Sequence, residues 1–311
     1  MAVSTVRPTQ APTQAPAPAP AAPRSPSSSP APAASGYRRQ RFLSWLGVHS
    51  VAVVLSIGFV APVVFIILTA FMSDHQALTR DLWPQSWHWD NFAKVFQQAP
   101  LLQYLFNSML YAVLATALML VSSVPVAYAL SRMKWRGRNA VFYLTIVTMM
   151  LPPQVIAVPL YVLWAHLHMT GTLWPLILPN LFGDAFSIFL MRQFLITIPQ
   201  SYSDAARVDG ASELTTLLKV ILPMAKPGIA AAALFSFLNA WNDYFGPLLY
   251  AGENSSNWTL SLGLASFHSV HQVNWNLTMA ATLLVMLPVI ILFFFAQKQF
   301  IEGIKFSGVK G

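Results

Sequence analysis

The sequence predicts an all-α integral membrane protein with six transmembrane helices, both termini in the cytoplasm, and a charged two-helix loop between spans 4 and 5. Three observations lead to this prediction. The 311-residue chain is 56% hydrophobic and only 9% charged, whereas about 25% of the residues in a typical soluble domain are charged. The apolar residues form long runs, and the basic residues gather at one set of run ends.

Six apolar segments are long enough to cross a bilayer, whose hydrocarbon core of about 30 Å requires about 20 helical residues. The predicted spans cover residues 48–71, 107–130, 140–164, 174–198, 229–250 and 278–297. Prolines interrupt the third and fourth segments, and membrane helices tolerate them where neighbouring groups satisfy the freed carbonyls. Residues 41–311 are therefore expected to form one transmembrane domain.

The distribution of lysine and arginine predicts the orientation of these spans. On one side of the membrane, only Arg80 and Lys94 lie near the span ends. The fourteen cations of the other side are Arg38, Arg39, Arg41, Arg132, Lys134, Arg136, Arg138, Arg192, Arg207, Lys219, Lys226, Lys298, Lys305 and Lys310. Because loops rich in lysine and arginine stay in the cytoplasm, both termini are expected there. Topology therefore explains the net charge of +8, and nucleic acid is not an expected partner.

The two long outer loops, residues 73–106 and 251–276, are rich in tryptophan. Tryptophan collects at the boundary between lipid headgroups and acyl chains, so membrane lipid is the expected partner of these loops. A docking surface for an external protein is the alternative.

Residues 1–40 differ in composition from the rest of the chain, because they are rich in proline, alanine and serine. Such a segment cannot bury enough apolar surface to offset the entropy of ordering, so a disordered cytoplasmic tail is expected. The segment has no apolar core of the kind found in signal peptides. Cysteine is absent, which excludes a disulfide framework and cysteine-ligated metal sites.

The stretch SDAARVDGASELTTLLKVILP, residues 203–223, lies between the fourth and fifth apolar runs and is charged. Its charged residues are Asp204, Arg207, Asp209, Glu213 and Lys219. Each would cost about 2.5–3.5 kcal/mol at the centre of a membrane helix, so the stretch is expected outside the bilayer.

The same stretch predicts two short helices joined by a bend. Ser201 and Asp204 have the spacing of a capping box at the start of the first helix, and Gly210 suits the left-handed position that ends it. The second helix is expected to start near Ser212. Its predicted apolar face consists of Leu214, Leu217, Leu218 and Ile221.

The spacing of small and apolar residues in this stretch is also specific. Asp204-Ala205-Ala206 is followed after three residues by Gly210, and after nine more by Val220-Ile221-Leu222-Pro223. This pattern resembles the EAA loop of the permease subunits of ABC importers, which usually has Glu in place of Asp204 and Ile in place of Val220. The segments DAARVDGAS, NAWNDYFGPLLY and GVKG further resemble the carbohydrate branch and its maltose-type permeases.

The resemblance implies that residues 199–226 form a coupling loop whose first helix docks on a separate ATPase subunit. The residues implied in this coupling are Ser203, Asp204, Ala205, Ala206, Arg207, Asp209, Gly210, Ala211, Leu222 and Pro223. The implied partners are a second homologous permease, two cytoplasmic ABC ATPases and an extracytoplasmic binding protein, and the implied location is the bacterial cell membrane. The chain lacks the phosphate-binding pattern G-x-x-x-x-G-K-[ST], so ATP and Mg²⁺ are expected on the ATPases, with no cofactor or metal on this chain.

Asp184 and Asp243 fall within predicted spans, where ionisable groups usually face a cavity or a partner. Amides and an aromatic residue occur near them in the sequence: Asn180, Asn239, Trp241 and Asn242. Such groups suit a hydroxyl-rich, uncharged ligand, so these residues are predicted to line a substrate path. Hydrogen bonds between helices are the alternative role for them.

The main prediction is a non-catalytic permease subunit that translocates a sugar or oligosaccharide, driven by ATP hydrolysis in partner subunits. Another small polar solute, such as a glycerol phosphate or a polyol, is an alternative. A secondary transporter is a second alternative, although no repeated halves are evident. A membrane-embedded enzyme would need a nucleophile with a base or a set of metal ligands, and the sequence shows neither.

Overall fold

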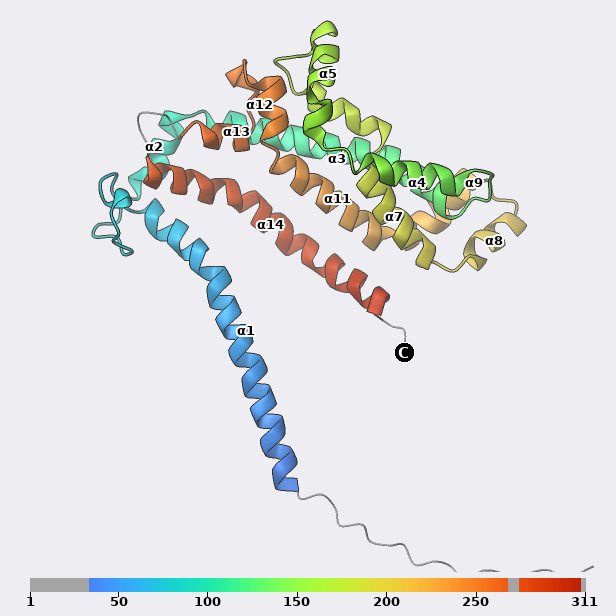
Figure 1. The fold of residues 1–311 in the computed structure, drawn as a ribbon, viewed down its shortest axis with the longest axis horizontal. Helices are drawn as coiled ribbons and strands as arrows, with labels where there is room; N and C mark the ends of the chain where they lie inside the picture. The colour runs from blue at the N-terminus through green and yellow to red at the C-terminus, as the bar shows by residue number, and fades with distance from the viewer. Residues whose placement is uncertain (1–33, 268–273, 309–311) are drawn as a thin grey trace, which may run out of the picture. The chain divides into compact units, whose positions relative to one another are not determined.

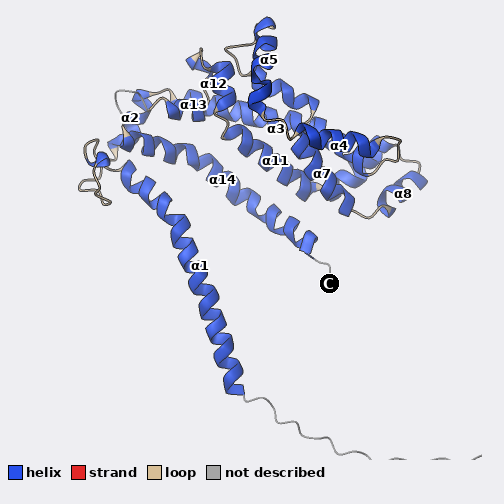
Figure 2. Ribbon diagram, in the orientation of Figure 1, coloured by secondary structure: helices blue, strands red, loops and turns tan. Residues whose placement is uncertain are grey.

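The structure is a computed structural model that describes residues 34–267 and 274–308, and every regular element assigned there is helical (Figures 1 and 2). The longer helices are α1 (Ala34–Ala70), α2 (Asp90–Gln98), α3 (Leu101–Ser131), α4 (Arg138–Thr148), α5 (Pro153–His166), α7 (Ala185–Thr197), α8 (Ser201–Val208), α11 (Lys226–Trp241), α12 (Phe245–Ala251) and α14 (Trp275–Gly308). The short ones are α6 (Trp174–Ile177), α9 (Glu213–Thr215), α10 (Leu222–Met224), α13 (Leu260–Ala265), η1 (Gln76–Leu78), η2 (Leu178–Phe182), η3 (Thr216–Ile221) and η4 (Ser255–Asn257). The all-α prediction is confirmed.

The chain divides after Gly58 into two units. In the first unit, the side chains of residues 42–58 on α1 are all exposed. A helix that is apolar on every side requires lipid or protein around it.

The predicted tail of residues 1–40 overlaps α1, which begins at Ala34. The rest of that prediction lies outside the described residues.

Four segments are long and apolar enough to cross a membrane, and two bent helix pairs raise the number to six if each pair is one span. The four are Phe42–Ala70, Leu101–Ser131, Trp174–Thr197 and Trp275–Phe295. The bent pairs are Arg138–Thr148 with Pro153–His166, at 91°, and Glu213–Met224 with Lys226–Trp241, at 83°. The predicted third span is therefore not the continuous helix that its apolar run suggests, whereas the second bend, at Ala225, lies before the predicted fifth span begins.

Proline and glycine account for the breaks in the third and fourth segments. Pro152 is extended, with φ −66° and ψ 135°, because a residue that precedes another proline disfavours the helical region. The chain then re-enters a helix at Pro153. In the fourth segment, Gly183 has a φ of +93° between η2 and α7. Glycine populates this left-handed region without a steric penalty.

The predicted fifth span, residues 229–250, is interrupted between α11 and α12. Asp243 supplies the physical reason, because its Oδ1 accepts a hydrogen bond from the backbone amide of Gly246 at 3.0 Å. An aspartate that bonds an amide three residues later favours the start of a new helix over the continuation of the old one.

Helix α3 is central to the packing of the second unit, because α7 and α11 both lie against it (Figure 1). One apolar cluster contains Tyr104, Tyr111, Trp164 and Trp241. A second cluster lies nearer the end of α3 and contains Tyr128, Met191, Leu195, Leu217 and Ile221. The second cluster includes residues of the predicted coupling loop, so the loop is packed onto the spans.

Candidate functional site

The predicted two-helix loop is present between α7 and α11. Helix α8 ends at Val208, and Gly210 has a φ of +78°, as predicted. The second helix runs from Glu213 to Met224 through α9, η3 and α10. Its N-cap is Ser212, whose Oγ accepts a hydrogen bond from the amide of Thr215 at 3.2 Å. The expected start of the second helix is therefore confirmed.

The predicted capping box of α8 is wrong. The N-cap residue is Gln200, and its side chain makes no capping hydrogen bond. Asp204 does not bond back to the start of the helix, because its Oδ1 accepts a hydrogen bond from Nη1 of Arg207 at 2.9 Å. The i,i+3 ion pair on the helix surface takes the carboxylate that the capping box would need.

The predicted apolar face of the second helix is only half correct. Leu217 and Ile221 are 4% and 0% exposed, whereas Leu214 and Leu218 are 65% and 52% exposed. The reason is η3, which is a π-helical segment. Because π-helical i→i+5 bonding widens the turn, residues three apart no longer share a face, although residues four apart do.

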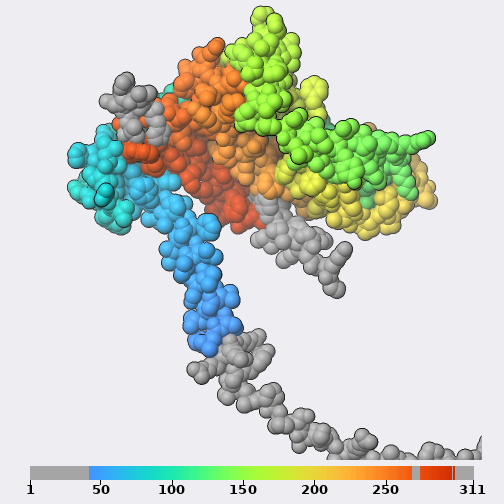
Figure 3. Space-filling view, viewed as in Figure 1, coloured from blue at the N-terminus to red at the C-terminus, as the bar shows by residue number. Residues whose placement is uncertain are grey.

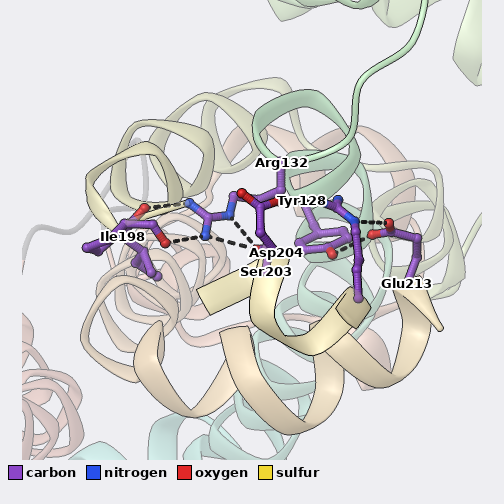
Figure 4. Close-up of polar contacts among 8 residues, drawn as sticks. Tyr128, Arg132, Ile198, Ser203, Asp204 and Glu213 are labelled. Carbon is purple, nitrogen blue, oxygen red and sulfur yellow. Dashed lines mark hydrogen bonds and ion pairs between the residues drawn. The ribbon is translucent and has the colours of Figure 1, made fainter. Parts of the chain in front are cut away.

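Arg132, at the end of α3, connects the spans to α8 (Figure 4). Its side chain is buried, and its Nε and Nη2 donate to Oγ of Ser203 at 3.3 and 3.0 Å. The remaining acceptors are the backbone carbonyls of Leu195, Ile198 and Pro199. These carbonyls lie at and just after the end of α7, and those of Leu195 and Pro199 also accept hydrogen bonds from the backbone amides of Ile198 and Tyr202. One guanidinium thus joins the ends of α3 and α7 to α8.

Arg132 stays charged in this buried position. Burial lowers the pKa of its guanidinium, but arginine keeps its proton in proteins because its ordinary pKa lies far above neutral pH. A buried charge is tolerated only when its hydrogen bonds are satisfied, and the carbonyls with Ser203 provide this. Because Ser203 belongs to α8, Arg132 keeps all of these hydrogen bonds only while α8 stays in this position.

A second group of contacts joins the two helices of the loop across the Gly210 turn. Nε of Arg207 donates to Oε1 of Glu213 at 2.9 Å, and this hydrogen bond raises the pKa of Arg207. Oη of Tyr128, on α3, donates to Oε2 of Glu213 at 2.7 Å (Figure 4). Glu213 therefore connects α8, α9 and α3.

The residues implied in coupling divide into an inner and an outer set. Ser203 and Ala206 are buried against the protein, so the two alanines of the motif do not share one outward face. Asp204, Ala205, Asp209, Gly210 and Pro223 are exposed, while Arg207, Ala211 and Leu222 are half-buried. Tyr202 and Val208, which the motif does not include, are 48% and 88% exposed. The outer face of α8 is therefore partly apolar.

The second part of the candidate site is a cavity of about 800 Å³ among α3, α5, α6, α11 and α12. Three of the six predicted path residues line it: Asn239, Asn242 and Asp243. The lining also contains Gln154 and the aromatic residues Tyr111, Trp164, Phe235, Tyr244, Phe245 and Tyr250. Polar groups and aromatic faces thus meet in one concave site.

Asp243 is held in the cavity wall by hydrogen bonds to both carboxylate oxygens. Oη of Tyr111 donates to Oδ2 at 3.0 Å, and the amide of Gly246 donates to Oδ1 at 3.0 Å. Among the described residues, the amide of Asn239 makes no hydrogen bond to protein, whereas that of Asn242 donates to the carbonyl of Leu238 at 2.8 Å. Asn239 and Gln154 are therefore the described cavity amides whose hydrogen-bonding capacity is free.

The other three predicted path residues lie elsewhere. Asp184 is the N-cap of α7 and accepts a hydrogen bond from the amide of Ser187 at 2.7 Å. The amide of Asn180 donates to the carbonyls of Leu176 and Ile177. Trp241 is only 2% exposed, within the apolar core. These contacts are structural, and none of the three residues lines the cavity.

Sequence reasoning missed Arg132, Tyr128 and Gln154. Arg132 is one of fourteen cations by which the spans were oriented, and no local pattern distinguishes it. The signal available was its place directly after an apolar span, where a charge can reach back into the protein. Its partners lie 63 to 71 residues away in the sequence, so only the fold identifies them.

The protein is a helical membrane protein with a polar cavity among its helices and a two-helix loop fixed to its span ends. This organisation is that of a solute permease. The family described as "Binding-protein-dependent transport system inner membrane component" matches residues 121–305 of the chain. The chain belongs to this family. The predicted resemblance to the permease subunits of ABC importers is confirmed.

Individual relatives cover nearly the whole membrane domain. The chain is 32% identical over 274 residues to the arabinooligosaccharides transport system permease protein AraQ of Halalkalibacterium halodurans, covering 86% of this chain and 97% of the relative. It is 32% identical to the diacetylchitobiose uptake system permease protein DasC of Streptomyces coelicolor, covering 84% and 95%. A chain from a bacterial ABC transporter involved in the import of alginate has the same fold, with a TM-score of 0.72, 23% identity, and coverage of 84% and 97%.

Proposed function

We propose that this chain is the translocating subunit of an ATP-driven importer of a sugar or oligosaccharide. The connection from α8 through Arg132 to the ends of α3 and α7 carries the proposal, because it provides a route by which force applied to the loop reaches the spans. Two relatives named for the transport of arabinooligosaccharides and diacetylchitobiose support the sugar class.

The proposal includes a topology of six spans, in which each bent helix pair counts as one span. Residues 199–226 then lie in the cytoplasm with both termini, as the fourteen cations favour. The charges of the loop and the exposed apolar residues Tyr202 and Val208 support a protein partner for α8 rather than water alone. Two ATPase subunits are the proposed partners there, and they would hold the ATP and Mg²⁺.

A second homologous permease and an extracytoplasmic binding protein complete the proposed assembly. The family name supports the binding protein, since it describes transport that depends on one. This chain is proposed to be non-catalytic, and the described residues contain no group of three potential metal ligands. Residues 41–311 act as one permease domain in this proposal.

The cavity is the proposed sugar path on this subunit. Amides and a carboxylate fix hydroxyl groups through hydrogen bonds, while aromatic faces cover the apolar faces of the rings. Among the residues that the structure describes, the lining contains Asp243 and no lysine or arginine. A glycerol phosphate or another anion would meet a carboxylate without a compensating cation, so a neutral solute is favoured.

The test is ATP-dependent uptake by the complex isolated from native membranes and reconstituted into vesicles. Labelled arabinooligosaccharides, a polyol and glycerol 3-phosphate are compared as solutes, each with and without ATP. Uptake of a neutral oligosaccharide that requires ATP supports the proposal. Uptake driven by an ion gradient without ATP would instead support a secondary transporter, and preference for glycerol 3-phosphate would contradict the neutral-solute assignment.

A further inference from the structure

A pocket of about 310 Å³ lies where the chain passes from α3 to α4, and no residue of the coupling loop or of the cavity is among its described lining residues. Its lining consists of Lys134, Trp135, Gly137, Arg138, Asn139 and Ala140. Arg136 is exposed in the same loop. Two cations and a tryptophan thus line one small concave site at the end of a span, and a third cation lies in the same loop.

These cations are not neutralised by carboxylates. Among the described residues, no ion pair includes Lys134, Arg136 or Arg138. Nη1 of Arg138 donates to the carbonyl of Met133 at 3.1 Å, which holds the guanidinium beside the pocket. The positive charge of the pocket is therefore available to an external anion.

A fourth cation is held one helical turn along α4. Arg192, from α7, places its guanidinium carbon 3.8 Å from the centre of the Phe142 ring. Its Nε donates to the carbonyl of Leu130 at 3.2 Å. Arg192 makes no ion pair among the described residues either, so it adds to the positive potential at this end of α4.

The start of α4 also favours an anion at this position. Gly137 is the N-cap residue, with a φ of +90°, and the pocket lining continues over the first three residues of the helix. The first amides of a helix have no partner within the helix, and they carry the positive end of its dipole. In this pocket they add to the charge of the side chains, which is the main attraction.

The surface next to the pocket is apolar. Val141, Leu144 and Val147, on one side of α4, are 41%, 65% and 55% exposed, and α4 lies at the surface in the green segment of Figure 3. Trp135 is 41% exposed, with its Nε1 donating to the carbonyl of Ala129 at 3.1 Å. Tryptophan with cations at the end of an apolar helix is typical of the headgroup region.

We propose that this pocket binds the phosphate group of an anionic membrane lipid, with the acyl chains lying along the exposed side of α4. The cations and helix amides recognise the phosphate, and the apolar stripe recognises the chains. A free phosphate ion would use only the first of these features. The stripe beside the pocket therefore favours a lipid over a soluble anion.

The test uses the full chain, purified from native membranes with the subunits that remain bound and then depleted of lipid. Short-chain phosphatidylglycerol, short-chain phosphatidylcholine and inorganic phosphate are titrated separately, and the thermal unfolding midpoint is followed. The variant combines Lys134→Gln with Arg136→Gln, because neither side chain makes a hydrogen bond or ion pair among the described residues. Its matched control combines Lys219→Gln with Lys226→Gln, which removes two exposed cations outside the pocket.

Phosphatidylglycerol is expected to stabilise the wild type and the control at concentrations where phosphatidylcholine and inorganic phosphate do not. The pocket variant should bind phosphatidylglycerol about 30-fold more weakly, given about 1 kcal/mol for each basic side chain at a membrane surface. Equal effects of the two lipids, or an unchanged response of the pocket variant, would overturn the proposal. A full response to inorganic phosphate would assign the pocket to a soluble anion. If phosphatidylglycerol stabilises the protein only in samples without the partner permease, this face binds that subunit, and the proposal is overturned.

Discussion

Nη2 of Arg132 lies 3.0 Å from Oγ of Ser203, and this contact joins the end of α3 to the first helix of the coupling loop. Ser203 is fully buried by the same packing. The two residues are 71 positions apart in the sequence. Their contact therefore makes the position of α8 a property of the folded membrane domain rather than of the loop alone.

Replacing Ser203 with alanine is expected to destabilise the protein by about 1–3 kcal/mol, because two donors of a buried guanidinium lose their acceptor. The thermal unfolding midpoint in detergent measures this effect. Ser201→Ala is the matched control, since Ser201 is exposed on the same helix. Equal midpoints for the two variants would contradict the role given to Ser203.

Arg132→Lys is expected to reduce ATP-coupled uptake while the chain still inserts into the membrane. Lysine keeps the charge, but it lacks the planar fork that reaches Ser203 and the carbonyls of Ile198 and Pro199 together. The loss of even one hydrogen bond to a charged group costs about 1.5–3 kcal/mol. Uptake per inserted molecule is the measurement, and wild-type uptake by this variant would show that charge alone suffices.

Gly210→Val should impair uptake much more than Gly210→Asn. A Cβ at Gly210 would have no atom within 4 Å, so the cost comes from the φ of +78° and not from a collision. That backbone conformation costs an ordinary residue roughly 1–2 kcal/mol, whereas asparagine visits it readily. The two variants are compared at equal membrane abundance. If both variants lose uptake equally, the assembled complex has no room for a side chain at position 210, and the backbone conformation is not the cause.

Tyr128→Phe and Glu213→Ala should show non-additive effects on stability. The 2.7 Å hydrogen bond from Tyr128 to Glu213 exists only when both groups are present, and such bonds contribute about 0.5–1.5 kcal/mol, or up to about 3 kcal/mol with a charged partner. A double-mutant cycle on the unfolding midpoint measures the interaction. Strictly additive effects would mean that the two residues act independently.

Asn239→Ala is expected to raise the KM for sugar uptake about 2- to 10-fold without changing the unfolding midpoint, as for the loss of one hydrogen bond of about 0.5–1.5 kcal/mol. Asn239 lines the cavity and makes no hydrogen bond to protein among the described residues. Asn180→Ala is the comparison, because its amide is committed to the carbonyls of Leu176 and Ile177. That variant should lower the midpoint and leave KM nearly unchanged. The reverse pattern would exclude Asn239 from the sugar path.

The sequence was sufficient for features that depend on local chemistry. Long apolar runs identified the helical segments, and Gly210 and Ser212 identified the bend of the loop, because these residues act through their own backbone positions. The interruption between α11 and α12 was not predicted, since Asn239, Asn242 and Asp243 were interpreted as polar residues of a substrate path within one continuous span. The hydrogen bond of Asp243 to the amide of Gly246 becomes visible only in the structure.

The candidate site was predicted in part for the same reason. Proximity in sequence grouped Asp184 with Asn180, yet both make local helix contacts that do not involve the cavity. Asn239 and Asp243 reach one cavity because α11 ends between them and α5 lies opposite, which only tertiary packing determines. The exposure of Leu214 likewise depends on a π-helical turn, which no residue type in this stretch predicts.

The acceptors of Arg132 have a consequence for exchanging parts between permeases. The carbonyls of Leu195, Ile198 and Pro199 belong to the backbone, so the identity of those side chains does not enter the contact. For these hydrogen bonds, the only side chains that must be kept are the arginine at position 132 and a hydroxyl residue at position 203. A foreign loop of the same backbone geometry that also keeps the bond to Tyr128 and the apolar packing should therefore graft onto this membrane domain, whereas the same loop on a domain without the arginine would lose this one attachment.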